Sequence, residues 1–203
     1  MVVCGCEALQ SPAMVDSVGA RCAVVLPGAR GGPCAPLPMF AGDAAEIRGA
    51  EVMRVSWIGT DDPLAMADAE RTRWVADQAA PALAGRTPLL IGKSLGTHAA
   101  GLAAERSLPA VWLTPLLGSA EVVTALERAT APFLLVGGSA DRAWDGTLAR
   151  RLTPHVLEVA DADHGMYVPG PLVESVAVLG RVVTAVERFL DEVIWPAGSS
   201  KLG

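Results

Sequence analysis

Short runs of apolar and β-branched residues alternate along the chain with longer segments in which apolar residues recur every three or four positions. Continuous apolar runs are typical of strands covered on both faces, and the longer pattern is typical of helices packed on a sheet. From residue 21 onward, this alternation predicts an α/β fold with a mostly parallel sheet and helices on both faces. Six strands are predicted, at residues 22–26, 51–57, 88–91, 110–113, 133–136 and 155–159.

The segments between the strands predict helices with recognisable starts and faces. Asp62 and Pro63 have the sequence of an N-cap followed by proline at the first helical position, and the pattern that follows ends at Pro81. A broad apolar stripe after Pro171, which includes Val176 and Leu179, indicates a long helix whose stripe is a packing face. Further helices are predicted at residues 95–106 and 119–129.

The length of 203 residues fits one compact domain with a full core. We therefore expect a single domain over residues 1–203, with an N-terminal segment at 1–20 and a flexible tail at 196–203, which is small and polar. No apolar run approaches the roughly 18 residues that span a bilayer. The first ten residues lack the positively charged start of a secretory signal, so a cytoplasmic protein is expected.

Charge and cysteine content narrow the classes of partner. The chain has 16 Lys and Arg against 22 Asp and Glu, a net charge of -6, with no basic cluster, so neither nucleic acid nor membrane is expected as a partner. A small-molecule substrate is favoured. No cysteine has a nearby histidine or zinc-finger spacing, so buried free thiols are expected, with no metal and no cofactor. The cysteines are Cys4, Cys6, Cys22 and Cys34.

The segment IGKSLGTHAAG, residues 91–101, places Ser94 between two glycines at the turn from a predicted strand to a predicted helix. Such a turn holds the serine backbone in a strained conformation that exposes the hydroxyl, and the glycines let strand and helix approach closely. The helix N-terminus adds a positive dipole end where negative charge would develop on a substrate. Ser94 is therefore a candidate nucleophile.

Other chemistries of the same segment are disfavoured. A phosphate-binding loop requires glycine five residues before Gly92, where the chain has Thr87 followed by a strand. A serine–lysine pair is disfavoured because neighbouring side chains near a strand end point apart, so Lys93 is expected to reach solvent or a carboxylate. The ring of His98 is expected to project along the helix, away from Ser94.

A serine nucleophile requires a base, and the base requires a carboxylate that fixes its tautomer. The loop GGSAD after the fifth apolar run ends in Asp141, and the loop DADHG after the sixth contains His164. Loops beyond the carboxyl ends of parallel strands converge at one edge of the sheet, so these residues are expected to meet Ser94 there. Asp145 and Asp163 are the alternatives to Asp141 as the acid.

The motifs GKSLG, GGSAD and DADHG, in the order serine, aspartate, histidine, resemble those of the α/β-hydrolase superfamily over residues 22–195. The resemblance implies the α/β-hydrolase fold, with a sheet of about six to seven strands. It also implies that Ser94 attacks an acyl carbonyl, that His164 acts as general base and then acid, and that Asp141 orients and stabilises the imidazolium.

The same resemblance implies an oxyanion hole made by the backbone N–H groups of Leu95 and Ala29. Members often carry His-Gly in the loop before the second donor, where this chain has Pro-Gly. Arg30 follows in that loop and is interpreted as solvated, with an acidic substrate group as the alternative contact. Residues near the active edge that could line an acyl pocket, or else pack in the core or loops, are Trp112, Trp144, Met166 and Tyr167.

These motifs predict an enzyme of a definite chemical class. A serine nucleophile excludes the epoxide hydrolase and dehalogenase branches, which attack with aspartate, and residues 114–131 leave no room for a cap domain. The expected function is cofactor-independent hydrolysis of a small carboxylic ester or thioester, as in lidless esterases and dienelactone-hydrolase-like members. The alternatives are a non-catalytic ligand-binding relative, and acyl transfer or cyclisation at the same serine.

Overall fold

The computed structural model describes residues 21–59 and 62–196. Its centre is a single sheet whose neighbouring strands are all parallel, in the order β2-β1-β3-β4-β5-β6. The prediction of a parallel six-stranded sheet is confirmed, although β2 ends three residues earlier than predicted and β3 and β5 each extend two residues further. The strands are β1 (Cys22–Leu26), β2 (Glu51–Arg54), β3 (Leu89–Lys93), β4 (Ala110–Leu113), β5 (Phe133–Gly138) and β6 (Val156–Val159).

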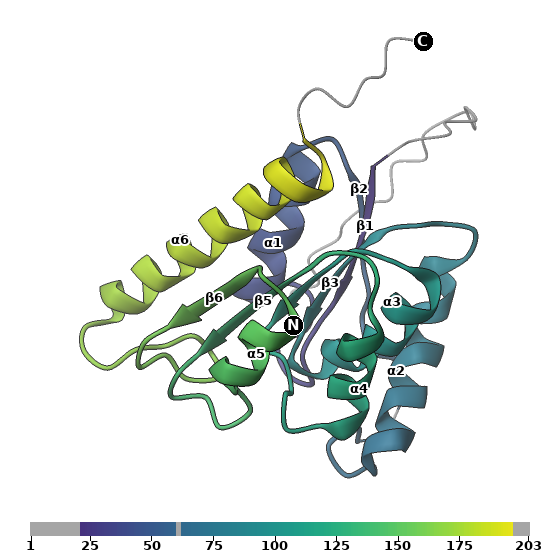
Figure 1. Ribbon diagram of the computed structural model, residues 1–203, viewed down its shortest axis with the longest axis horizontal. Helices are drawn as coiled ribbons and strands as arrows, with labels where there is room; N and C mark the ends of the chain where they lie inside the picture. The colour runs from purple at the N-terminus through teal and green to yellow at the C-terminus, as the bar shows by residue number, and fades with distance from the viewer. Residues whose placement is uncertain (1–20, 60–61, 197–203) are drawn as a thin grey trace, which may run out of the picture.

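Helices cover both faces of the sheet (Figure 1). Helices α1 and α6 pack on one face, and α2, α3, α4 and α5 pack on the other. Helix α4 alone lies between β4 and β5, in a stretch that is described throughout, so no cap domain is inserted there, as predicted. The helices are α1 (Pro36–Ile47), α2 (Asp68–Leu83), the 3₁₀ helix η1 (Ser94–Ala99), α3 (Ala100–Arg106), α4 (Ala120–Arg128), α5 (Gly146–Leu152), α6 (Leu172–Phe189) and the π-helical turn η2 (Leu190–Ile194).

The buried strands explain the continuous apolar runs of the sequence. Successive side chains of a strand point to opposite faces, so a doubly covered strand has no solvent side. Val24 and Val25 of β1 are both fully buried, the first against the α2 side and the second against the α1 side. Leu90 and Ile91 of β3 repeat this arrangement. The central strands are therefore rigid supports for the loops at their carboxyl ends.

The predicted start of the helix after β2 is wrong. The Asp62 side chain accepts a hydrogen bond from the Leu64 amide at 3.0 Å, and the Asp62 carbonyl accepts one from Ala65 at 3.0 Å. These bonds close a local turn, and α2 begins only at Asp68. The predicted stop is also wrong, because α2 includes Pro81, which lies in its last turn, where little helix remains to be disrupted.

The structure tests the predictions about the termini and the cysteines only in part. The N-terminal segment 1–20, with Cys4 and Cys6, and residues 197–203 of the tail lie outside the described residues. Cys22 and Cys34 are free thiols, but the first is half-buried and the second exposed, so the expectation of buried thiols is wrong for Cys34. Among the helices of the described residues, none is both long and apolar enough to cross a membrane.

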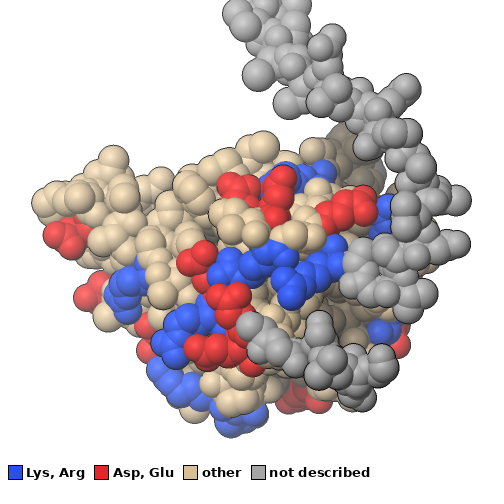
Figure 2. Space-filling model, turned by 90° about the horizontal axis from the view of Figure 1, so that it is seen from above, with Lys and Arg blue, Asp and Glu red and all other residues tan. Residues whose placement is uncertain are grey.

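Charged side chains of opposite sign are interspersed on the surface. Figure 2 shows Lys and Arg side chains among Asp and Glu side chains on the face seen from above. Arg48 pairs with Asp191 at 2.6 Å, and Arg54 pairs with Asp43 at 2.6 Å. Both arginines therefore form ion pairs with carboxylates on the surface.

Candidate active site

Ser94 lies in a sharp turn between β3 and η1, with a backbone φ of 51°. This left-handed conformation is costly for a residue with a side chain, and it is typical of functional sites. A Cβ atom at Gly92 would overlap the Trp112 ring, and one at Gly96 would overlap the carbonyl of Leu26. The turn therefore requires both glycines, because β4 and β1 press directly against it.

The hydroxyl of Ser94 begins a continuous chain of hydrogen bonds. Its Oγ lies 2.8 Å from Nε2 of His164, whose Nδ1 lies 2.7 Å from Oδ2 of Asp141. Oδ1 of Asp141 accepts a further hydrogen bond of 2.9 Å from the Ala143 amide. The three side chains come from the loops after β3, β5 and β6, so the carboxyl ends of three parallel strands converge as the sequence predicted.

The environment of Asp141 favours its ionised form. Its side chain is only 3% exposed, and this burial by itself would raise the pKa of Asp141. The hydrogen bonds from His164 and the Ala143 amide outweigh burial, with help from the positive charge of Lys93, so the net pKa of Asp141 is lowered. An ionised carboxylate only accepts hydrogen bonds, so His164 carries its proton on Nδ1 and leaves Nε2 free to accept one from Ser94.

The two alternative acids have structural roles. The Asp145 carboxylate caps α5 by accepting a 2.9 Å hydrogen bond from the Leu148 amide. The Asp163 carboxylate accepts hydrogen bonds from the amides of Gly165 at 2.8 Å and Tyr167 at 2.9 Å, which fixes the loop that carries the histidine. Of the three candidate carboxylates, Asp141 is therefore the one bonded to the imidazole.

The loop after β1 lies close to Ser94, where an oxyanion hole was predicted. The Leu95 amide directly follows Ser94, and a Cβ at Gly28 would lie 3.6 Å from the Ser94 Cβ. The Gly28 carbonyl accepts a 3.0 Å hydrogen bond from the Trp57 indole, a residue not predicted to contribute to the site. In a trans peptide the carbonyl and the following N–H point in opposite directions, so the Ala29 N–H points away from Trp57.

The nearby histidine faces another helix. The side chain of His98 is fully buried, and its Nδ1 lies 2.8 Å from the Thr72 hydroxyl on α2. Burial lowers the pKa of His98 to about 4, despite the charge of Asp68, whose Oδ1 is 3.8 Å from Nε2. His98 therefore supports the helix behind the turn. No hydrogen bond joins it to Ser94, and both residues lie within the described part of the chain.

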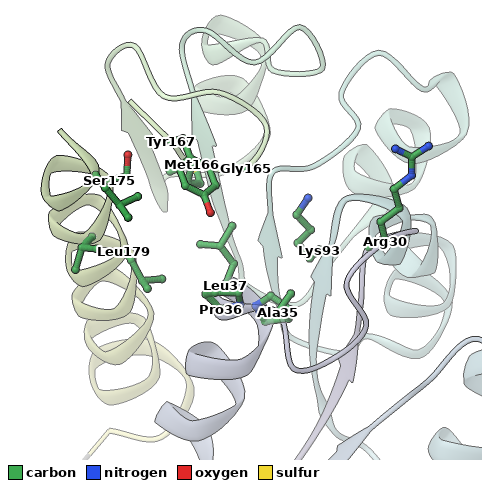
Figure 3. A pocket seen from close by; sticks show the side chains of 14 residues that line it. Arg30, Ala35, Pro36, Leu37, Lys93, Gly165, Met166, Tyr167, Ser175 and Leu179 are labelled. Carbon is green, nitrogen blue, oxygen red and sulfur yellow. The ribbon is translucent and has the colours of Figure 1, made fainter. Parts of the chain in front are cut away.

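A cavity of about 410 Å³ opens beside the turn, between the start of α1 and the first half of α6 (Figure 3). Of the four residues proposed to line a pocket, Met166 and Tyr167 do so. Trp112 is 1% exposed and packs against Gly92 in the core. Trp144 packs against β5, and its indole donates to Glu158 at 2.7 Å. The apolar lining includes Leu37, Met166, Tyr167, Leu172, Val176 and Leu179.

The α6 side of the cavity was not predicted from the sequence, where the whole apolar stripe of this helix was interpreted as a packing face. Leu172, Val176 and Leu179 recur at helical spacing and line the cavity. Leu172 is 68% exposed and Val176 is 58% exposed, so this part of the stripe is uncovered. The apolar spacing of these residues is visible in the sequence, but the sequence does not show that this part of the stripe stays uncovered in the fold.

The sheet order, the strained serine after β3 and the polar loops after β5 and β6 together define the α/β-hydrolase fold. No protein-family model matches the sequence, and no curated protein sequence matches it at a significant level. The structure, in contrast, is similar to solved α/β hydrolases, which establishes the fold.

Three solved structures illustrate this similarity. Est1E from Butyrivibrio proteoclasticus has a TM-score of 0.64 at 13% identity, over 86% of this chain and 88% of that one. XC6422 from Xanthomonas campestris, described as an α/β serine hydrolase without a lid, has a TM-score of 0.53 at 18% identity, over 86% and 85%. A dienelactone hydrolase from Anabaena variabilis has a TM-score of 0.56 at 17% identity, over 87% and 88%.

Proposed function

We propose that this protein is a serine hydrolase that cleaves a small carboxylic ester or thioester through an acyl-enzyme. The observation that carries the proposal is the hydrogen-bond chain from Ser94 through His164 to Asp141. It begins at a serine whose backbone has the left-handed conformation. A hydroxyl becomes an effective nucleophile when an oriented base removes its proton. The hydrogen bonds that join His164 to Ser94 and to Asp141 support these two roles.

In the proposed reaction, Ser94 Oγ bonds to the acyl carbon while His164 Nε2 takes the hydroxyl proton. The carbonyl electron pair moves onto oxygen, where the amides of Leu95 and Ala29 donate to it. Collapse of this intermediate breaks the bond to the leaving alcohol or thiol, which receives the proton from His164. A water molecule then repeats the sequence on the acyl-enzyme and releases the acid, while Asp141 stabilises each imidazolium.

Fold and cavity both support this class of reaction. Est1E also has a solved structure with ferulic acid bound, and the Anabaena variabilis protein is a dienelactone hydrolase, so similar folds carry hydrolase chemistry. The cavity beside Ser94 is open and mainly apolar, and it lies within the size range of small-molecule sites. The mechanism uses only side chains, backbone amides and water, so it requires no cofactor.

The direct test is labelling with a fluorophosphonate probe, followed by mass-spectrometric mapping of the modified residue. We expect one modification, at Ser94, and turnover of short 4-nitrophenyl esters that disappears in Ser94→Ala. Absence of labelling in folded protein, or equal turnover by Ser94→Ala, would overturn the proposal. Product analysis adds a further check, because release of the free acid indicates hydrolysis, whereas a transferred or cyclised acyl group indicates a different reaction at the same serine.

A further inference from the structure

Lys93, which was expected to reach solvent or a carboxylate, ends strand β3 directly before Ser94, and its half-buried side chain lines the cavity. The stem packs on the loop after β1, since a Cβ at Gly28 would lie 3.1 Å from Lys93 Cδ. Figure 3 shows the Lys93 side chain between Arg30 on one side and Met166 and Tyr167 on the other. The cavity beside the serine therefore contains an amino group.

This amino group has no carboxylate partner among the described residues. Ion pairs within 4.0 Å join several arginines to acidic side chains, but none includes Lys93, and no described acceptor is hydrogen-bonded to it. Burial lowers the pKa of Lys93, while the charges of Asp141 and Asp163 act in the opposite direction. The ammonium has lost part of its hydration without gaining a partner, a situation that binding of an anion would relieve.

The rest of the cavity offers apolar surface and little competing polarity. Leu37, Leu172 and Leu179 line it, and the hydroxyl of Ser175 already accepts a 3.1 Å hydrogen bond from the Val168 amide. The other cationic side chain at the cavity, Arg30, belongs to an exposed residue at its edge. An occupant that matches this lining has an apolar chain or ring and one negative group.

We propose that Lys93 is the specificity-determining residue of this cavity and that it binds a carboxylate on the acyl part of the substrate. The preferred substrates are then monoesters or monothioesters of dicarboxylic acids, with an apolar spacer against α1 and α6. This inference rests on the proposed hydrolase function. It adds the chemical class of the acyl group, because an ammonium in an apolar cavity distinguishes a carboxylate from an uncharged end of the same length.

The test compares two substrates that differ only in charge, 4-nitrophenyl hydrogen adipate and 4-nitrophenyl methyl adipate. We expect the wild-type kcat/KM to favour the hydrogen adipate by about tenfold or more, as one charge-assisted hydrogen bond provides. Lys93→Met should lower this preference at least about tenfold, and Lys93→Arg should retain most of it. Arg128→Met, which removes an exposed positive charge from α4 outside the cavity, should retain the full preference.

A binding measurement separates failure of this inference from failure of the hydrolase function. Calorimetry with Ser94→Ala should show tighter binding of monomethyl adipate than of dimethyl adipate, and adding Lys93→Met should remove the difference. If Ser94 is labelled by the probe but neither turnover nor binding differs between the adipate with a free carboxylate and its methyl ester, the inference is overturned. The proposed hydrolase function is then still supported. If labelling fails but Lys93-dependent binding persists, the proposed hydrolase function is overturned, and the proposed anion site is supported. If kcat/KM falls equally for both adipate esters in folded Lys93→Met, the inference is also overturned.

Discussion

The carboxylate of Asp141 lies 2.7 Å from Nδ1 of His164 and is almost completely shielded from solvent. A shielded carboxylate next to an imidazole stabilises positive charge on the ring, because little water screens the interaction. The amide of Ala143 keeps the carboxylate fixed from the other side. The imidazole of His164 is therefore held in one orientation by the protein itself.

This arrangement predicts a large effect of Asp141→Asn. The amide can donate to Nδ1, which would place the ring proton on Nε2 and remove the acceptor for the Ser94 hydroxyl. We expect kcat for a neutral ester to fall by on the order of 10³-fold to 10⁴-fold. The matched control is Asp145→Asn, since asparagine caps a helix about as well as aspartate, and its kcat should stay within about twofold of wild type. A comparable loss in both variants would contradict the assignment of the acid.

Gly96, two residues after Ser94, predicts a different kind of defect. In Gly96→Ala the new methyl group would overlap the Leu26 carbonyl, so β1 and η1 must separate. We expect the free energy of unfolding to fall by roughly 1–3 kcal/mol and the rate of probe labelling at Ser94 to fall with it. Denaturant unfolding and labelling kinetics measure these two effects.

Gly101→Ala is the control for that substitution. Gly101 lies in α3, and a Cβ there would meet nothing within 4 Å. Alanine loses less conformational entropy than glycine when it is placed in a helix, so the free energy of unfolding should rise by about 0.5–1 kcal/mol. If both alanine variants were equally destabilised, the close approach at Gly96 would not explain the first result.

Much of the fold was predictable because its cause is local. Val24 and Val25 are apolar in succession since each faces a different helix layer, and this produces a run that is visible in the sequence. The proximity of Ser94, Asp141 and His164 followed from a rule about parallel strands, because each residue comes soon after a strand end. Burial on two faces and loop position are thus properties that one sequence can reveal.

Other features depend on contacts between distant segments. Helix α1 was not predicted, because its buried positions include Ala41, Ala44 and Ala45, which give only a weak apolar stripe. Asp62 and Pro63 have the sequence of a helix start, but their local turn satisfies the same hydrogen-bonding groups without a helix. The cavity could not be predicted because its walls come from α1, β3 and α6, which meet only in the folded protein.

The indole of Trp57 predicts an effect on the proposed oxyanion hole without contact to the substrate. Its hydrogen bond to the Gly28 carbonyl sets the orientation of the peptide that carries the Ala29 N–H. Trp57→Phe should leave KM for a neutral ester nearly unchanged and lower kcat by roughly threefold to tenfold, since the weakened donor is used in the transition state. Trp74→Phe is the control, because Trp74 packs against Trp57 at 5.4 Å but has no bond to this loop among the described hydrogen bonds. Equal kcat losses in the two variants would point to packing instead.

Burial of His98 predicts a specific dependence of stability on pH. Its folded-state pKa is about 4, below the ordinary value of 6.5, because burial disfavours the charged ring; Arg71 also lowers it and Asp68 raises it. The unfolded chain therefore binds a proton between pH 6.5 and 4 that the folded chain does not, so stability falls as pH decreases through this window. Above pH 6.5 the ring is neutral in both the folded and the unfolded chain, so burial of His98 carries no penalty from protonation there.

His98→Gln removes this titration, and the difference from wild type isolates it from the carboxylates that both proteins share. We expect the free energy of unfolding of wild type, relative to His98→Gln, to decrease by up to roughly 3 kcal/mol between pH 7 and pH 4. Urea unfolding at pH 7, 6, 5 and 4 measures the change. A difference that stays constant over this range would mean that the buried ring accepts a proton without penalty, perturbing neither its contact with Thr72 nor the packing of α2 on η1.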